Sequence, residues 1–222
     1  MNVLHFVNAF FSDGAHWHGY DGIPTRLAEH LRYSLTALGL AAVMALPIGL
    51  FTGHYGRGGN ALALIATAGR ALPSFGLLVL MFILLGFGMV PVMIPLVVLA
   101  VPPILVTTYE AMRSVDPSPV DAARGMGMGE SRVLFHVELP VALPLILSGL
   151  RSAAIQIVST ATIAAYVSLG GLGRYIVDGL YQRDYEKVVG GATLVAVLAL
   201  ATLGVFWAAA RFAVSPGVRR GG

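Results

Sequence analysis

The sequence predicts an all-α integral membrane protein with five or six transmembrane helices, and two observations support this class. First, 57% of the 222 residues are hydrophobic and only 11% are charged, with a mean hydropathy of +0.80. Soluble domains carry about 25% charged residues, so this chain has less than half of the usual share. Second, the apolar residues form long runs, and a transmembrane helix needs about 20 of them in succession.

Five apolar segments are long enough to be transmembrane helices. They lie at about residues 33–52, 61–87, 92–109, 141–167 and 188–212. The second segment is longer than one crossing requires, and Pro73 inside it is expected to kink or break the helix. A complete break would give two crossings and six transmembrane helices. Five is the preferred count, because neither half of a broken segment would span the bilayer comfortably.

The chain divides into three parts around these segments. Residues 1–30 are expected to form an extracytoplasmic, interfacial segment, because Trp17 suits the headgroup level and Pro24 is typical of a helix start. The first residues lack the basic region of a cleavable signal. Residues 31–214 would form the transmembrane domain, and residues 215–222 a short cytoplasmic tail.

Basic residues near the segment ends predict the orientation. If the charged loop around Asp121 is cytoplasmic, the inner side carries slightly more arginine and lysine than the outer side, most clearly at Arg219 and Arg220. The N-terminus would then lie outside and the C-terminus inside. The formal net charge of +3 is too small and scattered to predict nucleic-acid binding, and the absence of cysteine excludes disulfides and thiol chemistry.

One charged loop, residues 110–140, interrupts the apolar pattern. Its centre reads DAARGMGMGESRVLFHVELP, from Asp121 to Pro140. Ser118 and Pro119 are typical of a helix N-terminus, with Asp121 near the positive end of the helix dipole. A short helix is therefore expected to begin there.

Glycine punctuates the same loop. Gly125, Gly127 and Gly129 allow positive φ, and they are expected to separate the first short helix from a second one at about residues 130–137. The second helix is expected to stop before Pro140, because the residue preceding a proline avoids the helical region. The loop would thus consist of two short helices hinged on glycine.

The order and spacing of residues in this loop resemble the signature of the permease subunits of binding-protein-dependent ABC importers. That signature is Glu-Ala-Ala, three residues, Gly, nine residues, Ile, one residue and Leu-Pro. Asp121 stands where the family has Glu, Val137 stands where it has Ile, and both replacements keep the chemistry. Six elements at fixed spacing make the match specific.

The likeness extends beyond the loop. Between residues 102 and 180, the stretches VDPSPVDAARGMGM, VELPVALPLILSGLR and ATIAAYVSLGGLGRYI are similar to the osmoprotectant branch of these permeases, which serves glycine betaine, carnitine, choline and proline betaine. The whole likeness covers roughly residues 33–200. Thr107 is one departure, since this branch usually has Asn there.

The resemblance implies a type I ABC importer permease fold and a function. The chain would be the permease subunit that moves a small compatible solute through the cytoplasmic membrane of a bacterium by alternating access. Its implied partners are cytoplasmic ABC ATPase subunits, a second permease copy or a homologous permease, an extracytoplasmic substrate-binding protein and membrane lipid. The chain has no Walker A sequence, so ATP and Mg would be bound by the partner ATPase and this chain would not be an enzyme.

The resemblance also assigns roles within the loop, which would be a coupling helix docked in a cleft of the ATPase. Small side chains at Ala122 and Ala123 would permit close approach, and Gly127 would allow a sharp turn. The full set of implied coupling residues is Asp121, Ala122, Ala123, Gly125, Gly127, Val137, Leu139 and Pro140.

Polar residues in the fourth span predict a solute path. One face of that helix repeats polar side chains every three or four positions. Its members are Ser148, Ser152, Gln156 and Ser159 or Thr160. Polar groups are costly against lipid, so this face is expected to contact protein or water. A packing seam of small and hydroxyl residues explains the pattern equally well.

A second set of path candidates surrounds Pro73. Arg70 lies inside the second apolar segment, with Thr67 and Ser74 near it. An intramembrane arginine is by default a functional or structural point. It would bond carbonyl groups freed by Pro73, snorkel, or pair with a solute carboxylate, and the structural roles are preferred.

Other functions fit the sequence less well. A proton- or sodium-coupled secondary transporter would bury an acidic residue in mid-span, and none of the 11 Asp and Glu residues lies there. A membrane-embedded enzyme would need a nucleophile with a base or a metal pair, and all 6 histidines lie outside the spans. No catalytic or metal site is therefore expected. An ABC permease for amino acids such as methionine is the nearest alternative, with the same architecture.

Overall fold

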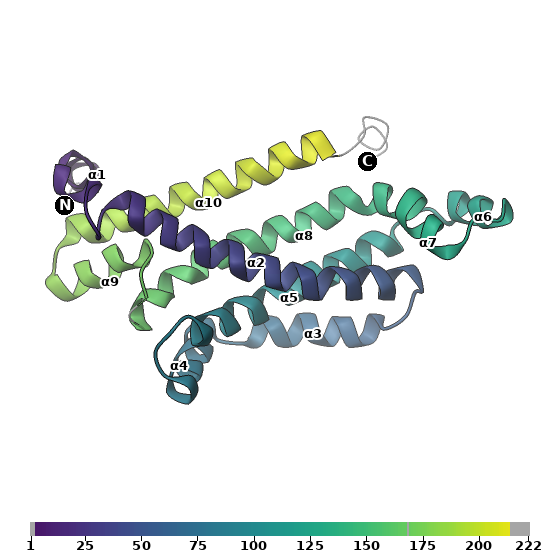
Figure 1. Cartoon of the computed structure of the whole chain (residues 1–222), viewed down its shortest axis with the longest axis horizontal. Helices are drawn as coiled ribbons and strands as arrows, with labels where there is room; N and C mark the ends of the chain where they lie inside the picture. Colours follow the sequence, from purple (N-terminus) through teal and green to yellow (C-terminus); the bar gives the residue numbers. More distant parts are fainter. Residues whose placement is uncertain (1–2, 168, 214–222) are drawn as a thin grey trace.

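The computed structural model describes residues 3–167 and 169–213, and every regular element in these ranges is helical (Figure 1). The longer helices are α2 (Ile23–His54), α3 (Gly59–Ala71), α4 (Ser74–Leu85), α5 (Val90–Arg113), α8 (Leu139–Thr160) and α10 (Tyr185–Ala213). The shorter elements are α1 (Val3–Ser12), η1 (Gly14–Trp17), α6 (Pro117–Gly125), α7 (Glu130–Val133), η2 (Leu134–Glu138), η3 (Ala161–Val167) and α9 (Gly173–Gln182). The long helices form an elongated bundle with α1 and α9 at one end and α6 and α7 at the other (Figure 1).

Four helices of the described chain are long and apolar enough to cross a membrane. They are α2, α5, the continuous stretch Glu130–Val167 and α10. The pair Gly59–Gly69 and Ser74–Leu85 passes the same test together and is bent by 84°. The break lies at Pro73, as the sequence predicts. At about 20 Å and about 18 Å, neither α3 nor α4 crosses a hydrocarbon core of about 30 Å, so their lengths favour five crossings over six.

The first span begins earlier than the sequence predicts. α2 starts at Ile23 rather than near residue 33 and runs unbroken for 32 residues, with Pro24 in its first turn. Proline is tolerated in that turn because its missing N–H has no partner within the helix. The segment that was expected to be interfacial and the first span are therefore one helix from Ile23 onward.

Small residues on one face of α2 let it pack closely along α5. The buried face includes Ala37, Ala41, Ala45, Gly49 and Gly53. A β-carbon on Gly49 would clash with Thr108 of α5, and one on Gly53 would clash with Met112. Close backbone approach through small residues is typical of membrane helices. The main apolar core continues from this seam into α8, through residues such as Ala153 and Ile157.

The first helix of the charged loop starts two residues before the predicted start. Asp116 is its N-cap, and the Asp116 carboxylate accepts a hydrogen bond from the backbone N–H of Ser118 at 2.9 Å. Pro117 occupies the first turn. The prediction that Ser118 caps the helix is therefore wrong, and Asp121 lies in the second turn, beyond the position that the dipole argument requires.

The second half of the loop does not stop before Pro140. α7 passes into a π-helical turn, η2, in which the N–H of Leu139 bonds to the carbonyl of Leu134, and α8 follows directly. Pro140 then lies in the first turn of α8, where proline is tolerated. Gly127 has φ +83°, as expected, whereas Gly129 is an N-cap with φ −69°. The predicted glycine hinge therefore depends on Gly127.

Candidate functional site

The residues of the loop motif lie on a compact hairpin formed by α6, α7 and η2, which is named the hairpin below (Figure 1). Ala123 is buried against Val133 inside the hairpin, with Val120 beside them. Asp121 and Ala122 are exposed. The small side chain of Ala123 therefore permits close packing within the hairpin, and Ala122 is the alanine on the outer surface.

The other motif residues divide between the tip of the hairpin and its base. Gly125 and Gly127 are exposed at the turn between α6 and α7. Val137 and Leu139 are half-buried in η2 and at the start of α8, where Pro140 is exposed. The tip thus offers a surface without large side chains at these positions, and the base continues into α8 without a break.

A chain of charged side chains crosses the hairpin and reaches α2. Arg124 contacts Asp121 at 3.7 Å and forms a bidentate pair with Glu130, with both nitrogen–oxygen distances at 3.0 Å. The hydrogen bonds to Glu130 raise the pKa of Arg124 above its ordinary value. Glu130 Oε2 is also 3.0 Å from Nε2 of His54, whose Nδ1 is 2.5 Å from Oε2 of Glu138. The exposed motif residue Asp121 is therefore linked through ion pairs to the end of α2.

The inner members of this chain are almost inaccessible to water. The side chain of His54 is 2% exposed and that of Glu138 is 7% exposed. Sequence reasoning missed His54, which lies 84 positions before Glu138, and no local pattern marks it. Glu138 fills the variable position of the motif, which gives no signal of its own.

The polar face of α8 partly lines a cavity of about 340 Å³ between α3, α5 and α8. Ser152 and Gln156 lie at this cavity, as do Thr107 and Glu110 of α5. The hydroxyl of Ser152 donates to the carbonyl of Ser148 at 3.0 Å, within its own helix. The amide of Gln156 is thus the larger polar group that α8 presents there.

The remaining path candidates lie around this cavity rather than at it. Ser159 is exposed and Thr160 is half-buried, and neither belongs to the cavity lining. Thr67 donates to the carbonyl of Ala63 at 2.9 Å. Ser74 is half-buried at the start of α4. The backbone of Arg70 is helical in α3, and its side chain lies outside the described part of the structure.

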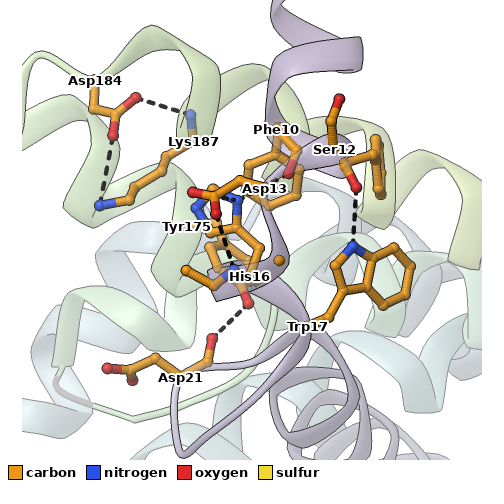
Figure 2. Close-up of polar contacts among 12 residues, drawn as sticks. Phe10, Ser12, Asp13, His16, Trp17, Asp21, Tyr175, Asp184 and Lys187 are labelled. Carbon is orange, nitrogen blue, oxygen red and sulfur yellow. Dashed lines mark hydrogen bonds and ion pairs between the residues drawn. The ribbon is translucent and has the colours of Figure 1, made fainter.

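Aromatic packing closes the opposite end of the bundle (Figure 2). Phe10 of α1 is fully buried, stacks on His16 with 4.3 Å between ring centroids, and meets the ring of Tyr175 edge to face at 5.3 Å. A β-carbon on Gly190 of α10 would overlap the ring of Phe10. The hydroxyl of Tyr175 donates to the carbonyl of Asp21 at 2.5 Å, and burial raises the pKa of Tyr175 to about 12.

A charged pocket of about 440 Å³ lies beside this aromatic cluster. Acidic and basic side chains both line it, and they include Asp13, Asp21, Asp178, Asp184, Glu186, Arg26, Arg174 and Lys187. Lys187 contacts Asp184 at 3.5 Å (Figure 2). Within the described residues, no group of three or more His, Asp or Glu side chains is placed to hold a metal ion. The pocket is therefore a surface of mixed charge.

Comparisons with known sequences all identify transport-system permeases as relatives of this chain. The family described as binding-protein-dependent transport system inner membrane component matches residues 45–220. The chain is 34% identical over 192 residues to the choline transport system permease protein OpuBB of Bacillus subtilis, covering 86% of this chain and 88% of that protein. It is 34% identical over 175 residues to the glycine betaine/carnitine/choline transport system permease protein OpuCB of the same organism, covering 79% and 81%.

Solved structures show the same fold. The MetNI methionine ABC transporter in inward-facing conformations matches with a TM-score of 0.73 at 22% identity, over 85% of this chain and 94% of that chain. An amino acid ABC transporter crystallised with histidines matches with a TM-score of 0.68 at 18% identity, over 95% and 98%. These likenesses confirm the predicted importer-permease fold.

Proposed function

The chain belongs to the family of binding-protein-dependent transport system inner membrane components, and we propose that it carries a small osmoprotectant into a bacterial cell as the permease subunit of an ATP-driven importer. Two relatives at 34% identity are named for choline and for glycine betaine, carnitine and choline. Their names support a quaternary ammonium solute. ATP and Mg would be bound by a separate ATPase, and a binding protein would deliver the solute.

The observation that carries this proposal is the placement of the loop motif on the exposed hairpin. Asp121, Ala122, Gly125 and Gly127 face outward, where an ATPase cleft would receive them. Ala123 and Val137 pack the hairpin from within. Because η2 continues directly into α8, movement of the hairpin would displace a helix that lines the cavity.

The cavity between α3, α5 and α8 is the proposed solute path. Ser152 and Gln156 would contact the solute, while Ser159, Thr160, Thr67 and Ser74 would lie along its approach. Movement of α8 against α5 would open the cavity alternately to either side of the membrane. Arg70 keeps its proposed structural role near the break at Pro73.

The orientation follows from the same proposal. With the hairpin in the cytoplasm, α1, α9 and the charged pocket lie outside, and the chain leaves α10 on the inner side (Figure 1). The mixed-charge pocket would then help to receive the binding protein. A second permease copy or a homologous permease would complete the transmembrane path.

Co-purification followed by reconstituted uptake tests the function. Tagged protein, extracted gently from native membranes, is expected to bring down an ABC ATPase and one or two permease sequences, identified by mass spectrometry. In proteoliposomes with the binding protein, radiolabelled glycine betaine or choline is expected to accumulate only with ATP. Isolation of the chain alone in several mild detergents would contradict the proposal. ATP-dependent uptake of methionine instead would favour the amino-acid alternative.

A further inference from the structure

We propose that His54 is a positioning residue that transmits movement of the hairpin to α2, an inference that rests on the proposed coupling function. The backbone joins the hairpin to α5 on one side and to α8 on the other. α2 has no such link, because the chain turns at Tyr55 and continues into α3. Side-chain contacts are therefore the means by which the hairpin can act directly on α2.

His54 makes those contacts with both α7 and η2 of the hairpin. Its Nε2 lies 3.0 Å from Glu130 at the start of α7, and its Nδ1 lies 2.5 Å from Glu138 at the end of η2. One imidazole thus spans the π-helical turn that joins α7 to α8. A sliding or unwinding of that turn would change one distance relative to the other.

The position of His54 makes these contacts costly to replace. The His54 side chain is 2% exposed, and the ring of Tyr55 meets it edge to face at 4.8 Å. Water therefore screens the contact with Glu138 poorly, whereas the side chain of Glu130 is 48% exposed. Separating His54 from Glu138 would leave the buried Glu138 carboxylate without this partner, so the contact resists separation when the hairpin moves.

α2 is built to carry the displacement further. At Gly49 and Gly53, the C-terminal half of α2 packs against Thr108 and Met112 of α5 without room for an added methyl group. A displacement applied at His54 therefore acts on α2 and α5 together. α5 supplies Pro102, Pro103 and Thr107 to the cavity, so the contact connects the hairpin with a cavity wall that α8 does not form.

The test measures solute moved per ATP hydrolysed in proteoliposomes holding the complete complex and binding protein, with radiolabelled glycine betaine as the probe. For His54→Gln, this ratio is expected to fall about tenfold while the assembled complex keeps its ATPase activity, the size of a typical coupling change. His18→Gln is the matched control, since His18 is exposed and contacts the carbonyl of Gly14 at the far end. An unchanged ratio in His54→Gln would overturn the proposal, because a purely structural histidine would lower the amount of complex and not the ratio.

A second experiment decides the question if His54→Gln fails to assemble. The chain contains no cysteine, so the pair His54→Cys and Glu138→Cys can be joined selectively by a short bismaleimide. The unjoined pair is expected to be poorly coupled and the joined pair to regain at least half of the wild-type ratio. Equal ratios with and without the linker would overturn the proposal. If wild-type complex shows no glycine betaine uptake with ATP, the proposed function fails instead, which separates the two ideas.

Discussion

The end of the bundle that carries α1 and α9 has a buried aromatic cluster beside separate surface ion pairs, whereas the end that carries the hairpin has a chain of charged side chains that reaches a buried histidine. At the first end, Phe10 is enclosed by His16, Tyr175 and Gly190, and Trp17 donates to the carbonyl of Phe11 at 2.9 Å. At the second end, a continuous chain of ion pairs runs from Asp121 to Glu138.

The difference indicates different mechanical roles. Closely packed apolar side chains have one arrangement of low energy, because each displaced contact leaves a void. The exposed ion pairs of Arg124 with Asp121 and Glu130 can exchange partners with water, whereas the buried contact of His54 with Glu138 resists separation. The α1 and α9 end therefore suits an anchor, and the hairpin end suits an element that moves and still transmits force.

The largest expected effect breaks the anchor. Phe10→Ala removes a fully buried ring and is expected to destabilise the α1–α10 contact by about 3–5 kcal/mol. The thermal midpoint of the complex in detergent should fall, while the solute moved per ATP by the surviving complex should stay constant. Val3→Ala on the same helix, where Val3 is 61% exposed, is the control and should leave the midpoint almost unchanged. A changed ratio of solute moved per ATP in Phe10→Ala would show that the α1 and α9 end also takes part in coupling.

The next effect breaks the hairpin. Gly127→Val forces a β-branched residue to φ +83°, which is expected to cost about 1–2 kcal/mol and to misplace the tip of the hairpin. Uptake should fall about tenfold or more while ATP hydrolysis continues, as measured side by side in proteoliposomes. Gly129→Val is the matched control, since Gly129 has φ −69° and no atoms within 4 Å of an added β-carbon. Equal uptake in both variants would remove the hinge from the coupling mechanism.

A smaller effect is expected from a substitution at the cavity, which lies between the two ends of the bundle and is the proposed solute path. Gln156→Leu replaces the amide at the cavity, and loss of one hydrogen bond to the solute would raise the KM for uptake about threefold to tenfold. Thr36→Ala is the control, because it removes a hydroxyl of α2 that bonds to the carbonyl of Arg32 away from the cavity, and it should leave the KM unchanged. If both variants transport normally with the complex intact, the polar face is a packing seam.

Local signals account for much of what the sequence predicts correctly. The break at Pro73, the positive φ of Gly127 and the helix start beside Pro24, where α2 begins at Ile23, each follow from the backbone chemistry of one residue. The motif has fixed spacing within one loop, so its hairpin is also recognisable. The extension of the helix through Pro140 was missed, because a π-helical turn has no reliable sequence pattern.

The parts that the sequence does not predict depend on distant contacts. His54 meets Glu138 across 84 positions of sequence, and Gly49 and Gly53 allow the close packing of α2 on α5 next to this contact. The cavity likewise needs α3, α5 and α8 together, so the pattern on α8 alone leaves path and seam equally supported. Ala123 illustrates the same limit, since its burial depends on Val133 across the hairpin.

The smallest expected effect tests how the hairpin begins. Asp116→Ala removes the carboxylate that caps α6 and is expected to destabilise this helix by about 1 kcal/mol. Hydrogen exchange of α6 amides should accelerate about fivefold, while the aromatic end should exchange at its original rate. Ser118→Ala is the control, because the backbone N–H at this position donates to the Asp116 carboxylate regardless of the side chain. Faster exchange in Ser118→Ala alone would instead place the helix start where the sequence predicts it. Faster exchange at both ends of the bundle after Asp116→Ala would mean that the hairpin and the anchor unfold as one unit, against the mechanical division between them.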